Sequence, residues 1–147
     1  KKNMVYQNLI NDLDKSDMIT GVLEILQSLK VKDYKLAVAS ASRNAKAVIE
    51  SLDLNVFFEV IADGNSVKKS KPAPDLFYYT AKKINLKPQN CLVIEDSKAG
   101  IIGAQKAGMK VIGIGPYERI GLADFCYKKV TDIDLDEVLN WKFTYFY

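Results

Sequence analysis

The sequence predicts an α/β fold built on a doubly wound parallel sheet. Short apolar runs alternate along the chain with segments of helical periodicity, and the runs are continuous rather than interrupted at every second residue. Strands that helices cover on both faces have this pattern. A length of 147 residues and a hydrophobic content of 48% are typical of one globular domain with its own core.

The first half of the chain supplies two of the expected strands. A polar stretch at residues 11–17 precedes a helix whose apolar residues, at positions 22–29, fall on one face, and Thr20 is its expected N-cap. We next expect a buried strand, a helix and a second strand, at residues 35–40, 44–52 and 58–62.

The second half supplies the remaining strands. Residues 63–74 are rich in Gly, Asn, Ser and Lys and predict a loop, after which Pro74 suits the first turn of a helix that extends to Ile84. The other expected elements are a buried strand at 91–95, a helix at 97–107 that Gly108 ends, a fourth strand at 110–114, a strand near Phe125 and a helix at 135–141.

The composition excludes several classes of function. The chain has no histidine, which excludes Ser-His-Asp hydrolases, Cys-His proteases and histidine metal sites if all catalytic residues lie in this chain. Its 21 basic and 18 acidic residues are mixed, without the basic stripe that binds nucleic acid. Cys91 and Cys126 predict no disulfide framework, so the cytoplasm is the expected location. No apolar run approaches the roughly 20 residues of a membrane span.

Chemically useful side chains stand directly after the predicted strands. In doubly wound sheets, ligands bind beyond the carboxyl ends of the strands. The residues found there are Ser40, Asp63, Glu95, Asp96 and Gly115. We therefore expect a functional site at this edge of the sheet.

Glu95 and Asp96 follow one apolar run and precede a helix. Two adjacent negative charges at a strand end are costly without a cation, and an oxygen-coordinated Mg²⁺ is the simplest partner. The alternative is that Asp96 or Ser97 only caps the next helix, because Asp and Ser are common N-caps.

Two further segments have the chemistry of a phosphate site. Ser40 opens a Ser-Ala-Ser-Arg-Asn segment whose hydroxyl, amide and backbone donors, at the start of a helix, suit a phosphate group. Capping of that helix is the alternative. Lys71 lies between a loop and two prolines that restrict the backbone. A lysine held there could bind a phosphoryl oxygen. The alternative is an ordinary solvent-exposed surface lysine, as most lysines are.

These three segments occur in the order, and on the elements, of motifs two, three and four of the haloacid dehalogenase superfamily, which the sequence resembles. Within that superfamily, residues 39–44, 69–77 and 94–100 are most similar to the β-phosphoglucomutase family. The resemblance implies a Rossmann-like core and covers nearly the whole chain, weakening after Pro116.

The resemblance implies a role for each motif. Ser40 and Lys71 are expected to bind the transferring phosphoryl group, and Glu95 and Asp96 are expected to help hold Mg²⁺. The residues expected to contact the sugar bisphosphate are Lys2, Ser40, Ala41, Ser42, Arg43, Asn44 and Lys71.

The chain departs from the family in two places. Members usually have lysine where this chain has Arg43. The change keeps the positive charge but replaces a compact ammonium group by a planar guanidinium group, which affects substrate preference. The first motif, an Asp-x-Asp that supplies the nucleophile and the general acid and base, has no counterpart after an apolar strand. The Asp-x-Asp spacings at residues 12–14 and 132–136 lie in polar surroundings and predict turn and cap residues.

Because the missing motif would lie on a central strand, we expect an incomplete core. Residues 1–15 are expected to be the end of a helical cap domain and a linker, and residues 16–147 the core without its first strand. The strands that end at Ser40 and Glu95 should then flank the position of the missing strand, leaving a gap or a borrowed strand between them. The expected partner is the missing N-terminal segment of the same protein, which should be a monomer when complete.

The expected function is Mg²⁺-dependent phosphoryl transfer on small-molecule sugar phosphates. An aspartyl phosphate on the absent segment would interconvert β-glucose 1-phosphate and glucose 6-phosphate through a bisphosphate, and this chain alone would be inactive. Two alternatives stay open: a sugar-phosphate or nucleotide phosphatase on the same fold, and a non-catalytic binding module.

Overall fold

The computed structural model describes residue 10 and residues 12–143. Its strands form two parallel sheets. In the first sheet, β1 (Ala37–Ala39) pairs with β2 (Val60–Ala62). The second sheet has the strand order β3, β4, β5, with bounds Leu92–Glu95, Lys110–Ile114 and Phe125–Tyr127.

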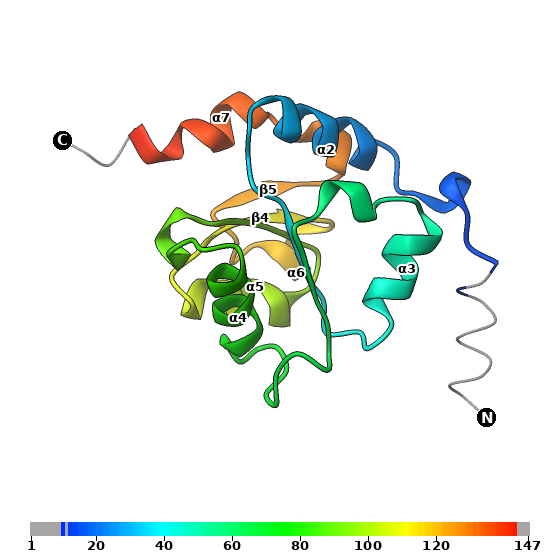
Figure 1. Ribbon diagram of the computed structural model, residues 1–147. Helices are drawn as coiled ribbons and strands as arrows, with labels where there is room; N and C mark the ends of the chain where they lie inside the picture. Colours follow the sequence, from blue (N-terminus) through cyan, green and yellow to red (C-terminus); the bar gives the residue numbers. More distant parts are fainter. Residues whose placement is uncertain (1–9, 11, 144–147) are drawn as a thin grey trace.

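Helices lie on both faces of these strands. α4 (Asp75–Lys83) packs against β1 and β2, α5 (Lys98–Lys106) packs against β3 and β4, and α3 (Ala45–Ser51) contacts β2. Figure 1 shows α2 (Val22–Val31) and α7 (Leu135–Leu139) on the other side of β4 and β5 from α4 and α5. The predicted doubly wound α/β fold is confirmed. None of the described helices is long and apolar enough to cross a membrane.

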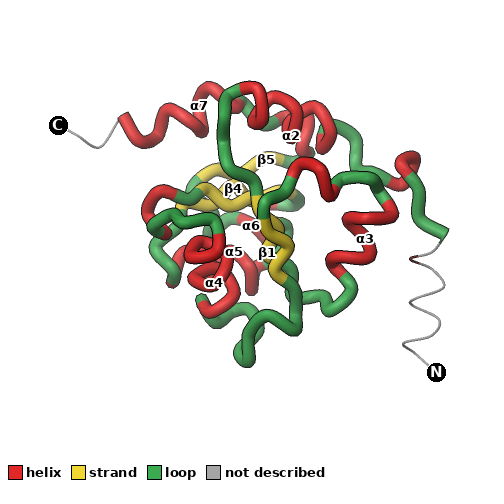
Figure 2. The backbone as a smooth tube through the Cα atoms, viewed as in Figure 1, coloured by secondary structure: helices red, strands yellow, loops and turns green. Residues whose placement is uncertain are grey.

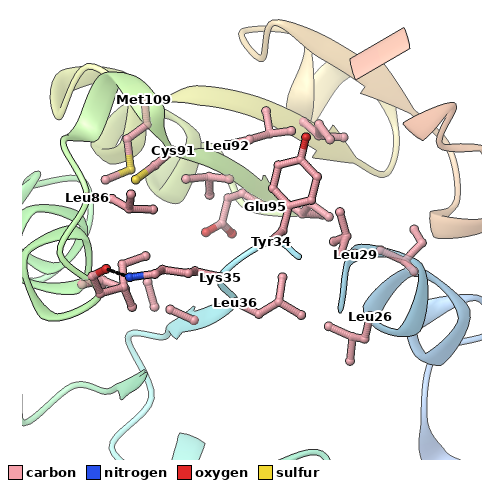
Figure 3. Close-up of a pocket in the computed structure, with 18 of the residues that line it drawn as sticks. Leu26, Leu29, Tyr34, Lys35, Leu36, Leu86, Cys91, Leu92, Glu95 and Met109 are labelled. Carbon is pink, nitrogen blue, oxygen red and sulfur yellow. Dashed lines mark hydrogen bonds between the residues drawn. The ribbon is translucent and has the colours of Figure 1, made fainter. Parts of the chain in front are cut away.

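The sheet is divided between β1 and β3, where the sequence predicts a gap. Within the described part of the chain, each of these strands has a hydrogen-bonded neighbour on one side only, and Figure 2 shows β1 apart from β4 and β5. A cavity of about 410 Å³ with mainly apolar walls lies between the two sheets. In Figure 3, Leu26 and Leu29 of α2 line one side of it and Leu92 of β3 lines another.

The core is unevenly distributed between the two sheets. Around β4, the buried side chains of Phe77, Ile101 and Val111 form one cluster, all at 2% exposure or less. Around β1 and α2, a smaller cluster joins Leu26, Leu36 and Leu54 at 4–9% exposure. The three-stranded part is therefore the better packed part of the fold.

Several predicted boundaries were wrong, and one helix was missed. Thr20 is not the N-cap of α2, because Gly21 takes that position with φ +91°, a left-handed conformation that favours glycine. The first two strands begin two residues later than predicted. The last predicted helix ends at Leu139 and continues as a 3₁₀ turn, and α6 (Tyr117–Ile120) was not predicted. Its four residues are too few for a recognisable helical period.

The Asp-x-Asp spacings serve turns and caps, as predicted. The Asp14 carboxylate accepts a hydrogen bond from the backbone N–H of Ser16 at 2.7 Å, at the start of a 3₁₀ turn. Asp134 caps α7 by accepting from the backbone N–H of Glu137 at 3.0 Å. Asp132 accepts from the backbone of Lys129 at 3.1 Å. None of these carboxylates stands at the end of a β-strand, as Glu95 does at the end of β3.

Candidate active site

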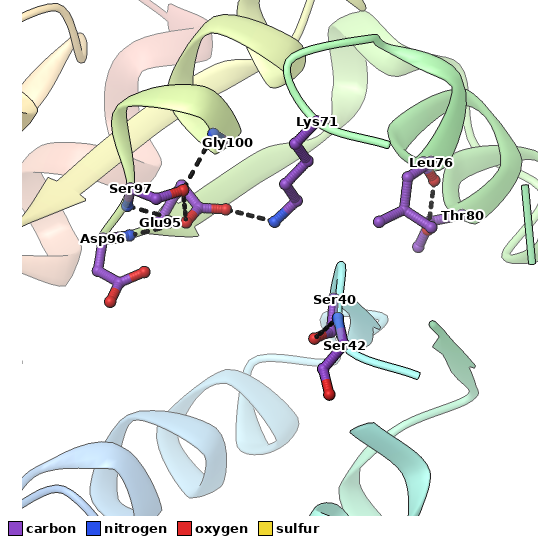
Figure 4. Close-up of polar contacts among 9 residues, drawn as sticks. All are labelled: Ser40, Ser42, Lys71, Leu76, Thr80, Glu95, Asp96, Ser97 and Gly100. Atoms are coloured by element: carbon purple, nitrogen blue, oxygen red, sulfur yellow. Dashed lines mark hydrogen bonds and ion pairs between the residues drawn. The ribbon is translucent and has the colours of Figure 1, made fainter. Parts of the chain in front are cut away.

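The predicted site residues stand at the carboxyl ends of the strands. Ser40 follows β1, Lys71 lies in the loop after β2, and Glu95 ends β3 with Asp96 directly after it. The structure brings Lys71 and Glu95 together, with Lys71 Nζ 2.6 Å from Glu95 Oε2. Figure 4 shows Ser40 on a separate segment, and no described hydrogen bond joins it to that pair.

The Lys71–Glu95 ion pair is largely withdrawn from solvent. The Lys71 side chain is 11% exposed and that of Glu95 is 9% exposed. Lys71 Nζ also lies 5.1 Å from the centre of the Phe77 ring, which adds a cation–π contact. Burial alone would raise the pKa of Glu95, but the hydrogen bond and charge of Lys71, together with Ser97, outweigh it and hold that pKa below its ordinary value.

Glu95 is held from its other side by the start of α5. Its Oε1 accepts hydrogen bonds from the backbone N–H of Asp96 and Ser97, both at 3.0 Å, and from the Ser97 hydroxyl at 2.9 Å. Ser97 in turn caps α5 by accepting from the N–H of Gly100 at 3.0 Å. Of the two predicted cap candidates, Ser97 is the cap and Asp96 is not.

Gly100 makes room for the Glu95 carboxylate. A Cβ on residue 100 would clash with the side chain of Glu95, because it would lie within bonding-like distance of the Oε2 atom and the carboxyl carbon. The ion pair therefore depends on a glycine in the first turn of α5. Sequence analysis missed the functional importance of Gly100, although its place three residues after Ser97, within a matched motif, was the available signal.

The Asp96 carboxylate differs from that of Glu95. Figure 4 shows it pointing away from Lys71, and no ion pair within 4.0 Å includes Asp96 in the described chain. Burial raises the pKa of Asp96, the adjacent Glu95 adds to the rise, and the charge of Arg119 opposes it. The surroundings of Asp96 therefore stabilise its ionised form less than the surroundings of Glu95 stabilise that of Glu95.

The carboxylates fit a Mg²⁺ site in part. Carboxylate oxygen is the ligand that Mg²⁺ prefers, and Asp96 presents such an oxygen at the strand end. Glu95 already engages both of its oxygens. Across the described residues, no group of three or more Asp, Glu, His or Cys side chains could hold a metal. The chain thus offers Asp96 as one ligand, with Glu95 beside it.

The segment after β1 is stabilised by its own hydroxyls. Ser40 Oγ accepts from the backbone N–H of Ser42 at 3.1 Å, and Ser42 Oγ accepts from the N–H of Asn44 at 3.2 Å. Asn44 precedes α3 without a side-chain cap bond, whereas Ala41 and Arg43 are exposed. The N-cap of α3 is therefore Asn44, and the Ser42 hydroxyl forms a local turn before the helix rather than a helix cap. Lys2 lies outside the described residues.

These features define an α/β domain with a polar site of mixed charge at the carboxyl edge of a parallel sheet. A family model described as "Haloacid dehalogenase-like hydrolase" matches residues 2–114. The chain belongs to this family, as its motifs predicted.

The relatives of the chain include both a mutase and a phosphatase. It is 35% identical over 136 residues to the β-phosphoglucomutase of Bacillus subtilis, covering 92% of the chain and 60% of that protein. It is 36% identical over 123 residues to a phosphorylated carbohydrates phosphatase of Thermotoga maritima, covering 82% of the chain and 57% of that protein. The chain therefore spans somewhat under two thirds of the length of these relatives.

A solved structure of β-phosphoglucomutase from Clostridium difficile has the same fold. Its TM-score is 0.91 at 33% sequence identity, and the match covers 95% of this chain and 62% of that chain. The similarity therefore includes both sheets and the carboxyl edge at which the candidate site lies.

Proposed function

We propose that the protein containing this chain transfers phosphoryl groups on sugar phosphates as a Mg²⁺-dependent β-phosphoglucomutase. The observation that supports this proposal best is the buried Lys71–Glu95 pair at the carboxyl edge of the sheet, in a chain whose relatives are mutases and phosphatases. A fixed, partly desolvated cation at that edge suits an anionic phosphoryl group, because charge neutralisation and positioning supply most of the catalysis in phosphoryl transfer.

Lys71 and Ser40 are proposed to bind the phosphoryl oxygens. The Lys71 ammonium has three N–H donors, of which Glu95 takes one, so others remain for a phosphoryl group. Ser40 uses its hydroxyl oxygen as an acceptor for the Ser42 backbone, which leaves its O–H free to donate. Glu95 positions Lys71 and keeps it from turning toward solvent.

Asp96 is proposed to be the Mg²⁺ ligand that this chain supplies, with Glu95 next to it. The ion would neutralise charge on the phosphoryl group when bound. The feature that fits this role is the position of the Asp96 carboxylate, directly after the strand end and outside the Lys71–Glu95 ion pair.

The covalent phosphoryl acceptor is proposed to lie on a strand that enters the space between β1 and β3. In the part of the chain that the structure describes, each of these strands has a hydrogen-bonded neighbour on one side only, and the cavity between them is mainly apolar. Residues 1–15 are proposed to end a helical cap domain that precedes the core. On this proposal, residues 1–147 alone bind phosphate but do not form an aspartyl phosphate.

The test is to incubate the chain with ³²P-labelled acetyl phosphate and Mg²⁺, alone and with the upstream segment added in trans. Alkali-labile label should appear only with that segment, and a Lys71→Met variant should reduce it strongly. Stoichiometric labelling of the chain alone would contradict the proposal, because it would require an acceptor among residues 1–147.

A sugar-phosphate phosphatase is the second candidate, favoured by the Thermotoga maritima relative. In that case water, rather than a second sugar hydroxyl, would take the phosphoryl group. Assays of the complete protein with β-glucose 1-phosphate, with and without a glucose 1,6-bisphosphate primer, distinguish the two. A mutase forms glucose 6-phosphate only with the primer, whereas a phosphatase releases inorganic phosphate in either case.

A further inference from the structure

Arg119 is a cation near the carboxyl edge of the sheet that belongs to none of the matched motifs. It lies in α6, the short helix after β4, and it is exposed. In the part of the chain that the structure describes, the Arg119 side chain takes part in no ion pair within 4.0 Å. Its charge therefore acts on the site without being neutralised by a salt bridge there.

The guanidinium of Arg119 lies against the backbone at the end of β4. Gly115 follows that strand with φ +133°, a conformation that favours glycine, and donates its N–H to the Tyr127 carbonyl at 2.9 Å. A Cβ on residue 115 would lie 3.2 Å from the central carbon of the guanidinium and would clash with one of its nitrogens. The glycine at this strand end thus allows the arginine to fold back over the edge of the sheet.

Lys71 and Arg119 approach the end of β3 from opposite sides. The strand order places β4, which leads into α6, on one side of β3, and the cavity that separates β3 from β1 lies on the other. Lys71 comes from the loop after β2 and pairs with Glu95. Figure 4 shows Asp96 pointing away from Lys71, and the charge of Arg119 lowers the pKa of Asp96 against the effect of burial. The two adjacent carboxylates are thus divided between two cations.

We infer that Arg119 is a positioning residue that holds the Asp96 carboxylate apart from Lys71 and sets the affinity of the site for Mg²⁺. This inference rests on the proposed role of Asp96 as a metal ligand. The guanidinium is always charged and attracts the carboxylate when no ion is bound. When Mg²⁺ binds to Asp96, the same charge repels the ion and weakens its binding. Among the described residues no salt bridge joins Arg119 to Asp96, so none has to break before the ion binds.

The experiment compares Arg119→Gln with Lys128→Gln in the complete protein. Lys128 is the matched control, because it is an exposed cation at the same edge of the sheet but follows β5, one strand further from Asp96. Calorimetric titration with Mg²⁺ in low salt should give a dissociation constant about fivefold lower for Arg119→Gln than for the parent protein, because a positive charge near the ion is removed. Lys128→Gln, and Arg119→Lys, which retains the charge, should each change it less than about twofold.

The dependence on salt separates an electrostatic role of Arg119 from a merely structural one. At about 1 M KCl, where the Debye length falls to about 3 Å, the difference between Arg119→Gln and the parent protein should shrink to less than about twofold. An undiminished difference in high salt, equal or weaker binding by Arg119→Gln in low salt, or an equal effect of Lys128→Gln would each overturn the inference. Failure of the proposed metal ligand has a different signature: Asp96→Asn would then bind Mg²⁺ as tightly as the parent protein, and the inference would fall with it.

Discussion

Ile94 and Ile112 are direct neighbours on adjacent parallel strands, yet their surroundings differ sharply. β3 pairs Ile94 with Ile112 of β4, so the two identical side chains stand side by side in one sheet. Ile112 is completely buried, whereas Ile94 is 43% exposed. Among the described residues, β4 has a strand on each side, whereas β3 has one on a single side. Burial in this fold is therefore decided by the neighbouring strand more than by the side chain itself.

The same contrast separates the two halves of the candidate site. Glu95 extends from the well-packed sheet and is fixed by Ser97 and the glycine at the start of α5. Ser40 extends from the two-stranded sheet, where its backbone N–H donates to the carbonyl of Ala62 at 2.9 Å and its hydroxyl accepts only from the Ser42 backbone among the described contacts. The Lys71–Glu95 ion pair is the contact by which the loop after β2 reaches the second sheet. The site thus depends on how the two halves are held together.

Replacing the two isoleucines should give the largest difference. Ile112→Ala should lower the free energy of unfolding by about 4 kcal/mol, because it leaves a cavity in a fully buried position. Ile94→Ala should cost less than about 1 kcal/mol, since much of that side chain already meets solvent. Urea unfolding of the chain measures both. Equal costs would show that β3 is covered on its open side.

Removing a lysine from each of two ion pairs should give the next largest difference. Lys71→Met should destabilise the chain by about 3 kcal/mol, because it leaves Glu95 buried without its cation. Lys110→Met removes the partner of Asp124 from a pair whose side chains are 30% and 24% exposed, and should cost less than about 1 kcal/mol. Thermal unfolding compares them. A larger cost for Lys110→Met would contradict the importance of the pair that joins the halves.

Mg²⁺ should stabilise the complete protein through Asp96. At a concentration ten times its dissociation constant, the ion should add about 1.4 kcal/mol to the free energy of unfolding. Asp96→Asn should abolish that increment, whereas Asp136→Asn, at an exposed position of α7, should preserve it. The measurement is the unfolding midpoint with Mg²⁺ and with chelator. An unchanged increment in Asp96→Asn would remove this residue from the proposed metal site.

The smallest expected effect is on the acid side of the stability profile. The pKa of Glu95 is lower in the folded chain than its ordinary value of 4.5, so its stabilisation is present above that pH and is lost as the pH falls through the folded pKa. Asp96 has a raised pKa and contributes in the opposite direction. Lys71→Met should flatten the loss of stability below about pH 4.5. An unaltered slope would show that other carboxylates dominate acid unfolding.

The fold was largely predictable, because it depends on patterns that repeat along the chain. The run Cys91-Leu-Val-Ile before Glu95 indicates a buried parallel strand, and Ser97 followed by a helical period marks the start of α5. The predicted gap between the strands that end at Ser40 and Glu95 was present, because strand order in such sheets follows from the motifs. The ends of several elements shifted, where single residues such as Gly21 decide the backbone, and the short helix α6 was missed.

The site was predictable in its residues but not in its pairings. The sequence predicts that Glu95 and Asp96 are both metal ligands. In the structure, Glu95 forms an ion pair with Lys71, and Asp96 takes no part in that ion pair. That division depends on side-chain rotamers and on the space above Gly100, neither of which a linear pattern contains.

The open edges of β1 and β3 have a consequence for the behaviour of the chain in concentrated solution. An unpaired strand edge is a template for any other extended polypeptide, and natural sheets usually protect it with charge, proline or a bulge. β1 consists of alanine and valine, and β3 carries no charge before Glu95. Self-association through these edges should therefore increase with protein concentration, and a peptide that fills the space between them should act as a solubilising agent.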